Sequence, residues 1–404
     1  MKEGWEIKTV GDVCQFQRGL TYAKGDEVDF SDNIVLRATN IDLATNLLVF
    51  DELKYINDKV IVPESKKVRK GSLMICTASG SKSHLGKVAY IDDDYGYAFG
   101  GFMGMLIPQT GILPKYLFHL MTSEDYKNFI GALADGANIN NLTFDNLKRF
   151  PVPVPPLPEQ QRIVGILDKA FAGLAVAVAN AEKNLQNARA LFESYLQSVF
   201  TQRGEGWVEK RLADVFTIGS SKRILETEWA PAGVPFYGGK EIVKLAKAGT
   251  VSSNSYISEK KYLEYASKYD MPQAGDILIT ARGTIGVGYV VRDGDRFYYK
   301  DGNIISMRAK IPTDPCFILY AFRSNAITDQ FGDLTGATVR HLPIEKAKKL
   351  VVSMPGLLAQ NRVVNQIREL EEETQRLTAI YEKKLAALAE LKKSLLRQAF
   401  SGEL

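Results

Sequence analysis

The most constraining feature of the sequence is an internal repeat with an offset of about 200 residues. Residues 4–5, Gly-Trp, return at 206–207, and the segment 71–75 returns in similar form at 275–279. From Gly136 onward the offset stays constant without a gap. Because the matches between these anchors are sparse, the pattern indicates two copies of one scaffold whose surfaces have diverged.

Each copy opens with a segment in which strand and helix patterns are mixed. Short apolar runs bounded by glycine-rich turns are typical of β-strands. A longer helical pattern follows at 114–133 in the first copy and at 315–331 in the second. We therefore expect each copy to form an α+β globule built on a strongly bent sheet. The expected strands are residues 34–36, 73–76, 88–91, 277–280 and 287–291.

A long helix completes each copy. The first copy enters it through the proline-rich segment 151–158, and prolines cannot continue a preceding helix. Pro158 suits a first helical turn, and Glu159 complements the positive helix start. Apolar or small residues then recur in steps of four and three with one extra step of four, which predicts a coiled-coil seam with a single stutter. The seam positions are Ile163, Leu167, Ala170, Leu174, Ala177, Ala181, Leu185, Ala188, Phe192, Tyr195 and Val199, followed in the second copy by Val363, Ile367, Leu370, Thr374, Leu377, Tyr381, Leu385, Leu388, Leu395 and Ala399.

The two seams differ in side-chain size, since alanines of the first copy correspond to leucines and a tyrosine of the second. This complementarity favours packing of the two helices on each other. A homodimerisation rod and an ordinary buried helix are the alternatives. The expected fold class is α+β, with two repeated domains containing bent β-sheets plus two long antiparallel coiled-coil helices. The expected boundaries are 1–157 for the first domain, 158–203 for the first helix, 204–356 for the second domain and 357–404 for the second helix.

Composition places the chain among ordinary globular proteins, with 45% hydrophobic and 24% charged residues. No unbroken apolar run of membrane-spanning length and no signal peptide pattern is evident, so we expect no membrane partner and a cytoplasmic location. Cys14, Cys76 and Cys316 fit neither a disulfide framework nor a zinc site, and we expect neutral thiols. The net charge of +4 is concentrated in the second half, which permits nucleic acid as a partner without requiring it.

Catalytic motifs are weak or missing. The loop 80–87 has one residue too many before Gly86-Lys87 for a phosphate-binding loop, and Val88 follows where Ser or Thr would bind magnesium. Residues 64–66, with Asp51 or Asp58 upstream, could imitate a nuclease metal site, but such triplets are common in solvated loops. We find no metal-ligand spacing among the histidines and no base-methylation motif. The sequence therefore predicts no catalytic residue, no metal site and no cofactor in this chain.

The helix entries and the chain end carry a resemblance to a known family. Residues 155–164 read PPLPEQQRIV, residues 395–404 read LLRQAFSGEL, and residues 275–284 read GDILITARGT. On these segments the whole chain resembles the specificity subunit of type I restriction–modification systems. The second entry departs from the pattern, having Leu358 and Ala359 where the first has Pro158 and Glu159. In that family, partner subunits dock beside these helix entries. The departure therefore puts in doubt whether the two docking surfaces of this chain are equally strong.

The resemblance implies a non-catalytic reader of double-stranded DNA. Each target-recognition domain would read one half of a bipartite, asymmetric target, and the helices would set the gap. Two methylation subunits would dock on the helices and motor-nuclease subunits would join them, so that S-adenosylmethionine, ATP and magnesium belong to partner subunits. The residues expected to bind partners are Gln160, Arg162, Gln360 and Arg362.

Base reading requires polar side chains on loops that approach DNA closely, with cations near phosphates. Two loops per copy qualify, and their glycines match while their polar residues differ. The alternative for each is a plain surface turn. Rival functions are a coiled-coil scaffold with two ligand-binding globules and a self-contained restriction or modification enzyme. The candidate DNA-binding residues are Ser79, Ser81, Lys82, Ser83, His84, Asn138, Asn140 and Asn141 in the first copy, and Arg282, Thr284, Thr338, Arg340 and His341 in the second. Further cation candidates, each more readily explained as a solvated charge, are Arg18, Lys24, Arg37, Lys66, Lys67, Arg69, Arg223, Lys240, Lys300 and Arg308.

Overall fold

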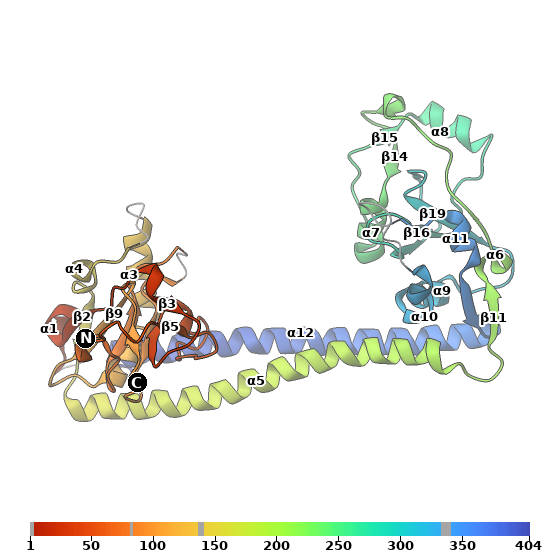
Figure 1. The fold of residues 1–404 in the computed structure, drawn as a ribbon. Helices are drawn as coiled ribbons and strands as arrows, with labels where there is room; N and C mark the ends of the chain where they lie inside the picture. Colours follow the sequence, from red (N-terminus) through yellow and green to blue (C-terminus); the bar gives the residue numbers. More distant parts are fainter. Residues whose placement is uncertain (1–3, 81–83, 136–140, 333–340) are drawn as a thin grey trace. The chain divides into compact units, whose positions relative to one another are not determined.

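The computed structural model of the chain describes residues 4–80, 84–135, 141–332 and 341–404. The chain folds into two compact units (Figure 1). Unit 1 comprises Met1–Glu182 and Lys383–Leu404, and unit 2 comprises Lys183–Glu382. Each unit therefore contains one globule together with parts of both long helices. The expected division into four consecutive segments describes the linear order of the chain, and it stays a prediction.

The globule of unit 1 is built from three small sheets. One is antiparallel, in the order β2-β9-β6-β7, and a second has the order β3-β5-β4-β8 with β4 and β8 parallel. A two-stranded antiparallel ribbon pairs β1 with β10. The strands are β1 (Glu6–Thr9), β2 (Cys14–Arg18), β3 (Glu27–Val28), β4 (Asn33–Leu36), β5 (Lys54–Ile56), β6 (Leu73–Cys76), β7 (Val88–Tyr90), β8 (Ala98–Phe99), β9 (Met103–Pro108) and β10 (Pro151–Val154).

The globule of unit 2 repeats this topology strand for strand. Its sheets have the orders β12-β19-β16-β17 and β13-β15-β14-β18, and β11 pairs with β20. The parallel pair again falls at the equivalent place, β14 with β18. The internal repeat thus reflects two related globules. The strands are β11 (Val208–Arg211), β12 (Phe216–Gly219), β13 (Trp229–Ala230), β14 (Val234–Tyr237), β15 (Tyr256–Ile257), β16 (Ile277–Thr280), β17 (Gly288–Val290), β18 (Tyr298–Tyr299), β19 (Ile304–Ala309) and β20 (Val351–Met354).

The expected α+β class, with two repeated domains and two long helices, is confirmed, and the strands of each globule are divided among separate short sheets. In unit 1 an isolated parallel bridge between Leu20 and Gly100 joins the end of β2 to the end of β8. The two backbones approach so closely there that a Cβ at Gly19 would lie 2.0 Å from the carbonyl oxygen of Gly100. This contact therefore links the two four-stranded sheets of unit 1.

The helical stretches of the globules are also shorter than expected. Residues 114–133 form α2 (Pro114–Leu120) and α3 (Glu124–Asp135), and residues 315–331 form α9 (Pro315–Arg323), α10 (Asn325–Thr328) and a 3₁₀ turn. Both breaks fall at a buried serine, Ser123 or Ser324, where the chain redirects. The remaining helices are α1 (Val10–Val13) and α4 (Phe144–Leu147) in unit 1, and α6 (Leu212–Val215), α7 (Gly239–Ala248), α8 (Glu259–Ala266) and α11 (Ile344–Lys349) in unit 2.

The two long helices are α5 (Leu157–Gln202) and α12 (Leu357–Ser401). Every predicted seam position on both is buried or half-buried, which confirms the periodicity. In unit 1 the Arg162 guanidinium contacts the main chain of Leu404, and in unit 2 Arg189 pairs with Glu382 at 2.9 Å. Within each unit the two helices are therefore antiparallel, and they pack on each other.

The hydrophobic core of each globule extends onto both helices. In unit 1 it includes Leu167 from the start of α5 and Leu396 from the end of α12. In unit 2 it includes Ile367 from the start of α12 and Leu196 from the end of α5. Each globule is thus fixed to the beginning of its own helix and to the end of the other.

By length and composition α5 is also apolar enough to cross a membrane. One such helix among the described residues is only weak evidence for a membrane span. Charged residues such as Asp168 and Lys169 interrupt the apolar run, so the sequence pattern alone did not indicate a membrane span. The seam residues of α5 pack against α12, which accounts for part of this apolar character.

Candidate nucleic-acid interface

Described residues at the edges of the two predicted loops are paired in each copy. In unit 2 an isolated bridge pairs Arg282 with His341, and the N–H of Leu342 donates to the carbonyl of Ala281 at 2.8 Å. In unit 1 the equivalent bridge pairs Ala78 with Asn141. The same backbone contact therefore joins the described edges of the two loops in both globules.

The described candidates lie at or near this junction. Arg282, Thr284 and Asn141 are exposed, whereas Ser79, His84 and His341 are half-buried. Side chains at equivalent places differ, because Ala78 of unit 1 corresponds to Arg282 and Asn141 to His341. The candidates that lie outside the described residues are Ser81, Lys82, Ser83, Asn138, Asn140, Thr338 and Arg340.

A surface depression of about 340 Å³ adjoins the junction in unit 2. Its lining brings Arg282 and His341 together with two cations from other segments, Arg223 and Lys300. Asp301 lines it as well. The site therefore combines hydrogen-bond donors and acceptors from the ends of several strands in one concave surface.

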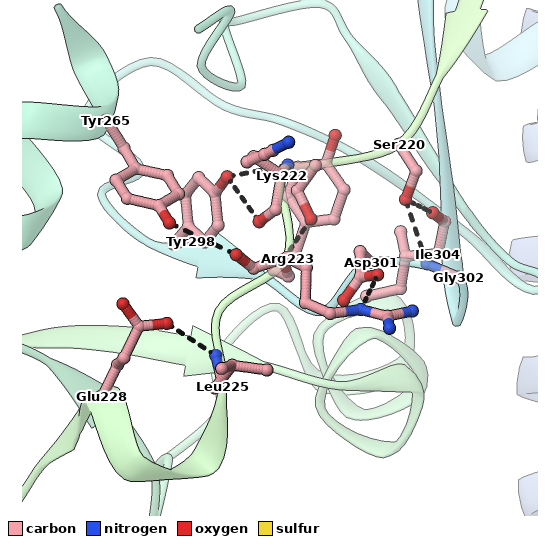
Figure 2. Close-up of polar contacts among 12 residues, drawn as sticks. Ser220, Lys222, Arg223, Leu225, Glu228, Tyr265, Tyr298, Asp301, Gly302 and Ile304 are labelled. Atoms are coloured by element: carbon pink, nitrogen blue, oxygen red, sulfur yellow. Dashed lines mark hydrogen bonds and ion pairs between the residues drawn. The ribbon is translucent and has the colours of Figure 1, made fainter. Parts of the chain in front are cut away.

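The two additional cations are each held in a defined place. The Nε of Arg223 donates to Oδ2 of Asp301 at 2.8 Å (Figure 2). The ammonium of Lys300 lies 5.7 Å from the ring centroid of Trp229, within the range of a cation–π contact. Of these residues the sequence identified Arg223 and Lys300 only as generic cations, and it missed Asp301 and Trp229.

In unit 1 two depressions share the exposed ring of Phe102, which is 74% exposed. One also includes Arg18, whose guanidinium lies 5.8 Å from the ring centroid of Phe144, together with Asn141. The other includes Lys24 and Arg37. Phe102 was not among the residues predicted from the sequence. An aromatic residue directly after Gly100-Gly101 is nevertheless a detectable signal of an exposed turn.

Arg37 carries a buried Nε that has no hydrogen-bond partner among the described residues. A buried donor without a partner is costly, and the cost is removed when an acceptor arrives. The acidic residue of the same depression, Glu27, is engaged by Lys54 at 2.7 Å, and this hydrogen bond lowers the pKa of its carboxyl. The surface thus has excess positive charge and one unmet donor.

Other predicted cations serve the fold. Arg308 binds Asp276 through Nε at 3.0 Å and through Nη2 at 2.7 Å, and Asp276 is buried. The ammonium of Lys66 donates to the carbonyl of Arg18 at 2.8 Å, and Lys67 pairs with Glu64. These contacts hold neighbouring strands and turns together.

Among the residues considered for nucleotide or metal binding, Lys87 takes part in a structural contact. Lys87 is buried and donates to the carbonyl of Ile41, and burial lowers the pKa of its ammonium. Within the described ranges no group of His, Cys, Asp or Glu is placed to hold a metal ion. The thiols are free, and burial raises the pKa of Cys14 to about 12 and that of Cys76 to about 11, so both are neutral thiols near pH 7.

The expected partner-binding role of the two helix-entry glutamines needs correction. Gln160 is fully buried; its Oε1 accepts from the N–H of Leu113 at 2.8 Å, and its Nε2 donates to the carbonyls of Gly111 and Pro155. Gln360 is 1% exposed and accepts from the N–H of Asp314 at 3.0 Å. Both amides fasten a helix start to its own globule, so neither side chain is available to a partner.

Arg162 and Arg362, the other expected docking residues, are exposed. Arg162 is oriented by Glu159, with an Nε to Oε2 distance of 2.7 Å. The second entry has Ala359 at the corresponding place, so this ion pair cannot form there. The helix start itself is unaffected, because α12 begins at Leu357 just as α5 begins at Leu157.

Comparisons with known proteins agree with this geometry. The family model of the type I restriction modification DNA specificity domain matches twice, at residues 2–184 and 204–385. The specificity subunit of the type I restriction enzyme EcoKI from Escherichia coli strain K12 is 28% identical, and the match covers 100% of this chain and 90% of that one. A Haemophilus influenzae protein named as a type I restriction enzyme specificity subunit is 33% identical over 65% of this chain, and 66% of its own length is covered.

Solved structures show the same fold. A chain from a structure on complex assembly and conformational transition of the type I restriction–modification system superposes with a TM-score of 0.76 at 19% identity, covering 100% of this chain and 99% of that one. The HsdS subunit from Thermoanaerobacter tengcongensis gives a TM-score of 0.64 at 18% identity, with 100% and 98% coverage. Two matched domains, each carried by one of two globules of equal topology, assign the chain to the family of type I restriction–modification DNA specificity proteins.

Proposed function

We propose that each unit reads one half of a bipartite, asymmetric target in double-stranded DNA. The observation that carries this proposal is the pair of equivalent loop junctions, Ala78 with Asn141 and Arg282 with His341. Their backbone is the same and their chemistry differs, as expected of two readers with different half-sites. The excess positive charge beside the junction of unit 1 suits the phosphates that flank the bases being read.

The partners follow from the same assignment. We propose that methylation subunits dock on α5 and α12 beside Arg162 and Arg362, and that motor-nuclease subunits join the resulting complex in the cytoplasm. S-adenosylmethionine, ATP and magnesium are then bound by those subunits, which also carry the catalysis. The missing carboxylate at Ala359 makes the second docking surface the weaker one, because Arg362 lacks the partner that orients Arg162.

An exchange of recognition units tests the proposal. Residues 204–356 are replaced by the corresponding segment of a specificity subunit with a known target, and the complex with its methylation subunits is used to modify genomic DNA. The expected methylome keeps one half-site and acquires the donor's second half-site. Purified complex that fails to retain DNA at physiological salt would instead favour a scaffold, and methylation by the chain alone with S-adenosylmethionine and magnesium would reveal an enzyme.

A further inference from the structure

The guanidinium of Arg223 is held at one edge and open at the other. Its Nε donates to Asp301, whose side chain is 18% exposed, while the Arg223 side chain is 72% exposed. Among the described residues, this is the only hydrogen bond that the guanidinium forms. The two Nη groups are therefore left as a planar fork of donors for a ligand.

The backbone that presents Arg223 is also fixed. The hydroxyl of the buried Tyr298 accepts from the N–H of Lys222 at 2.9 Å and donates to the carbonyl of the same residue at 3.0 Å (Figure 2). The hydroxyl of Tyr265 donates to the carbonyl of Arg223 at 3.2 Å. The hydroxyl of Ser221 donates to the carbonyl of Tyr299 at 2.6 Å. A side chain whose backbone and one edge are both anchored loses little entropy when it binds a ligand.

Arg223 shares its surface depression with Arg282 and His341, the junction residues of unit 2. It reaches that place from the segment between β12 and β13, which is separate in sequence from both loops. The proposed reading surface of unit 2 thus has a third contributor that neither loop supplies.

The ion pair also indicates which acceptor this fork suits. The carboxylate of Asp301 offsets the positive charge of Arg223, which weakens its attraction for an anionic phosphate. A neutral group with two adjacent acceptors remains a good partner, and guanine presents such a pair, O6 and N7, in the major groove. We propose that Arg223 reads a guanine in the half-site of unit 2 and that Asp301 is its positioning residue. This inference rests on the proposed function and adds the base and the side chain that reads it.

Substitution of Arg223 in the complex of the full chain with its methylation subunits tests the assignment. Arg223→Ala is expected to lower the preference for guanine at one position of one half-site by about 10- to 100-fold, the usual range for a bidentate contact. Arg223→Lys restores that preference only in part, because an ammonium lacks the planar fork. Methylome sequencing and competition binding with duplexes altered at that position give the readout. The half-site of unit 1 is the internal control.

Arg296→Ala is the matched control variant, since Arg296 is also an exposed arginine of unit 2 paired with a carboxylate, that of Glu259, and it lies outside the depression. The DNA motif recognised by the complex with this variant is expected to stay unchanged. For Asp301, the Asp301→Ala variant should tolerate other bases at the same position, whereas Asp301→Asn, which keeps an acceptor for Nε, should recover most of the guanine preference. A merely structural role of Asp301 would reduce binding to all targets equally and would leave the motif intact.

Three results would overturn the inference while leaving the proposed function in place. The first is a wild-type half-site of unit 2 without a guanine on either strand. The second is an unchanged motif in the Arg223→Ala variant. The third is a uniform loss of affinity with a smaller salt dependence, which marks a phosphate contact. Failure of the proposed function looks different, because the wild-type complex would then show no bipartite target.

Discussion

At the scale of single residues, equivalent positions of the two units combine a shared backbone with different side chains. The isolated bridge at the loop junction joins Ala78 to Asn141 in one unit and Arg282 to His341 in the other. Only the second pair offers a cation and an imidazole. Because bases are read by side-chain donors and acceptors and the backbone only presents them, this arrangement permits the specificities to diverge without a change of fold.

Arg282→Ala tests whether the junction of unit 2 contacts the bases of its half-site. The variant is expected to relax or abolish recognition in the half-site of unit 2 alone, at a cost of about 1–3 kcal/mol if the guanidinium makes a bidentate base contact. Methylome sequencing of a strain carrying the variant provides the measurement. An unchanged motif would reject the assignment of Arg282.

Phe102→Ala addresses unit 1 in the same way. The exposed ring lies beside both Asn141 and Arg37 in the two depressions, and an aromatic ring there suits contact with a thymine methyl group or a base face. We expect weaker DNA binding and a relaxed half-site of unit 1, with the half-site of unit 2 as the reference. Phe30→Ala, at another exposed phenylalanine of the same unit outside these depressions, is the control that should leave binding unchanged.

At the scale of elements, each long helix is anchored to its globule by a buried glutamine. Gln160→Ala would remove an acceptor from Leu113 and donors from Gly111 and Pro155. Each main-chain group left buried without a partner costs about 1–3 kcal/mol, so the variant should unfold at clearly lower denaturant concentration. Arg162→Ala, which removes the partly exposed ion pair with Glu159 and the contact with the main chain of Leu404, should change the free energy of unfolding by less than about 1 kcal/mol. Equal stability of the two variants would contradict the anchoring role of Gln160.

The contact between α2 and α5 predicts a pH dependence. His119 is buried with Nε2 2.9 Å from Oδ1 of Asp168, and burial lowers the pKa of the imidazole although Asp168 and its hydrogen bond act in the opposite direction. The folded chain therefore binds fewer protons at this site than the unfolded chain, so its stability falls as the pH drops below about 6.5, the unfolded value. Burial acts to raise the pKa of Asp168, but the hydrogen bonds from Lys115 and His119 together with their charges bring this pKa below its usual value, so Asp168 remains charged in this range.

Urea unfolding at pH 7.5 and pH 5.5 measures this effect. His119→Phe should reduce the loss of stability between the two pH values relative to the wild type. The equivalent position in unit 2 is Tyr320, whose pKa is raised by burial, so Tyr320→Phe should keep the wild-type dependence over this range. A wild-type pH profile retained in the His119→Phe variant would show that His119 does not contribute to it.

At the scale of the whole molecule, α5 and α12 are the two covalent connections that each pass from one unit into the other. Insertion of seven residues into both helices, next to Glu182 and Lys383, would lengthen each by about 10 Å and keep the seam in phase. We expect the gap of the DNA target to grow by about three base pairs, at 3.4 Å each, with both half-sites unchanged. Methylome sequencing would report it. A motif with altered bases and the original gap would contradict a spacer role of the helices.

Insertion into α5 alone is the control for this experiment. It would displace one seam against the other and should lower the thermal stability of the complex, because apolar seam positions such as Ala181 and Ala188 would lose their packing. The doubly lengthened chain should regain that stability.

Much of the architecture could be predicted from the sequence, because it depends on local patterns. The repeat predicted two related globules, and steps of three and four predicted the buried seam of both helices, since these features are set by periodicity along the chain. Two strands, Leu73–Cys76 and Ile277–Thr280, were predicted with their bounds, because they are fully buried apolar runs between turns. Matching glycines singled out the two loops in each copy, but not the backbone bridge that the structure shows at their edges.

Only the tertiary structure decided which polar residues line the surface depressions and which hold the fold. Gln160 and Arg308 could have belonged to a binding surface by residue type, yet both are engaged by main-chain or carboxylate partners that lie far away in the sequence. Arg223 was one cation among many until folding placed it against Asp301, which follows it by 78 residues. Hydrogen bonds between distant segments are set by the meeting of strands and helices in three dimensions, and no local pattern of residues records them.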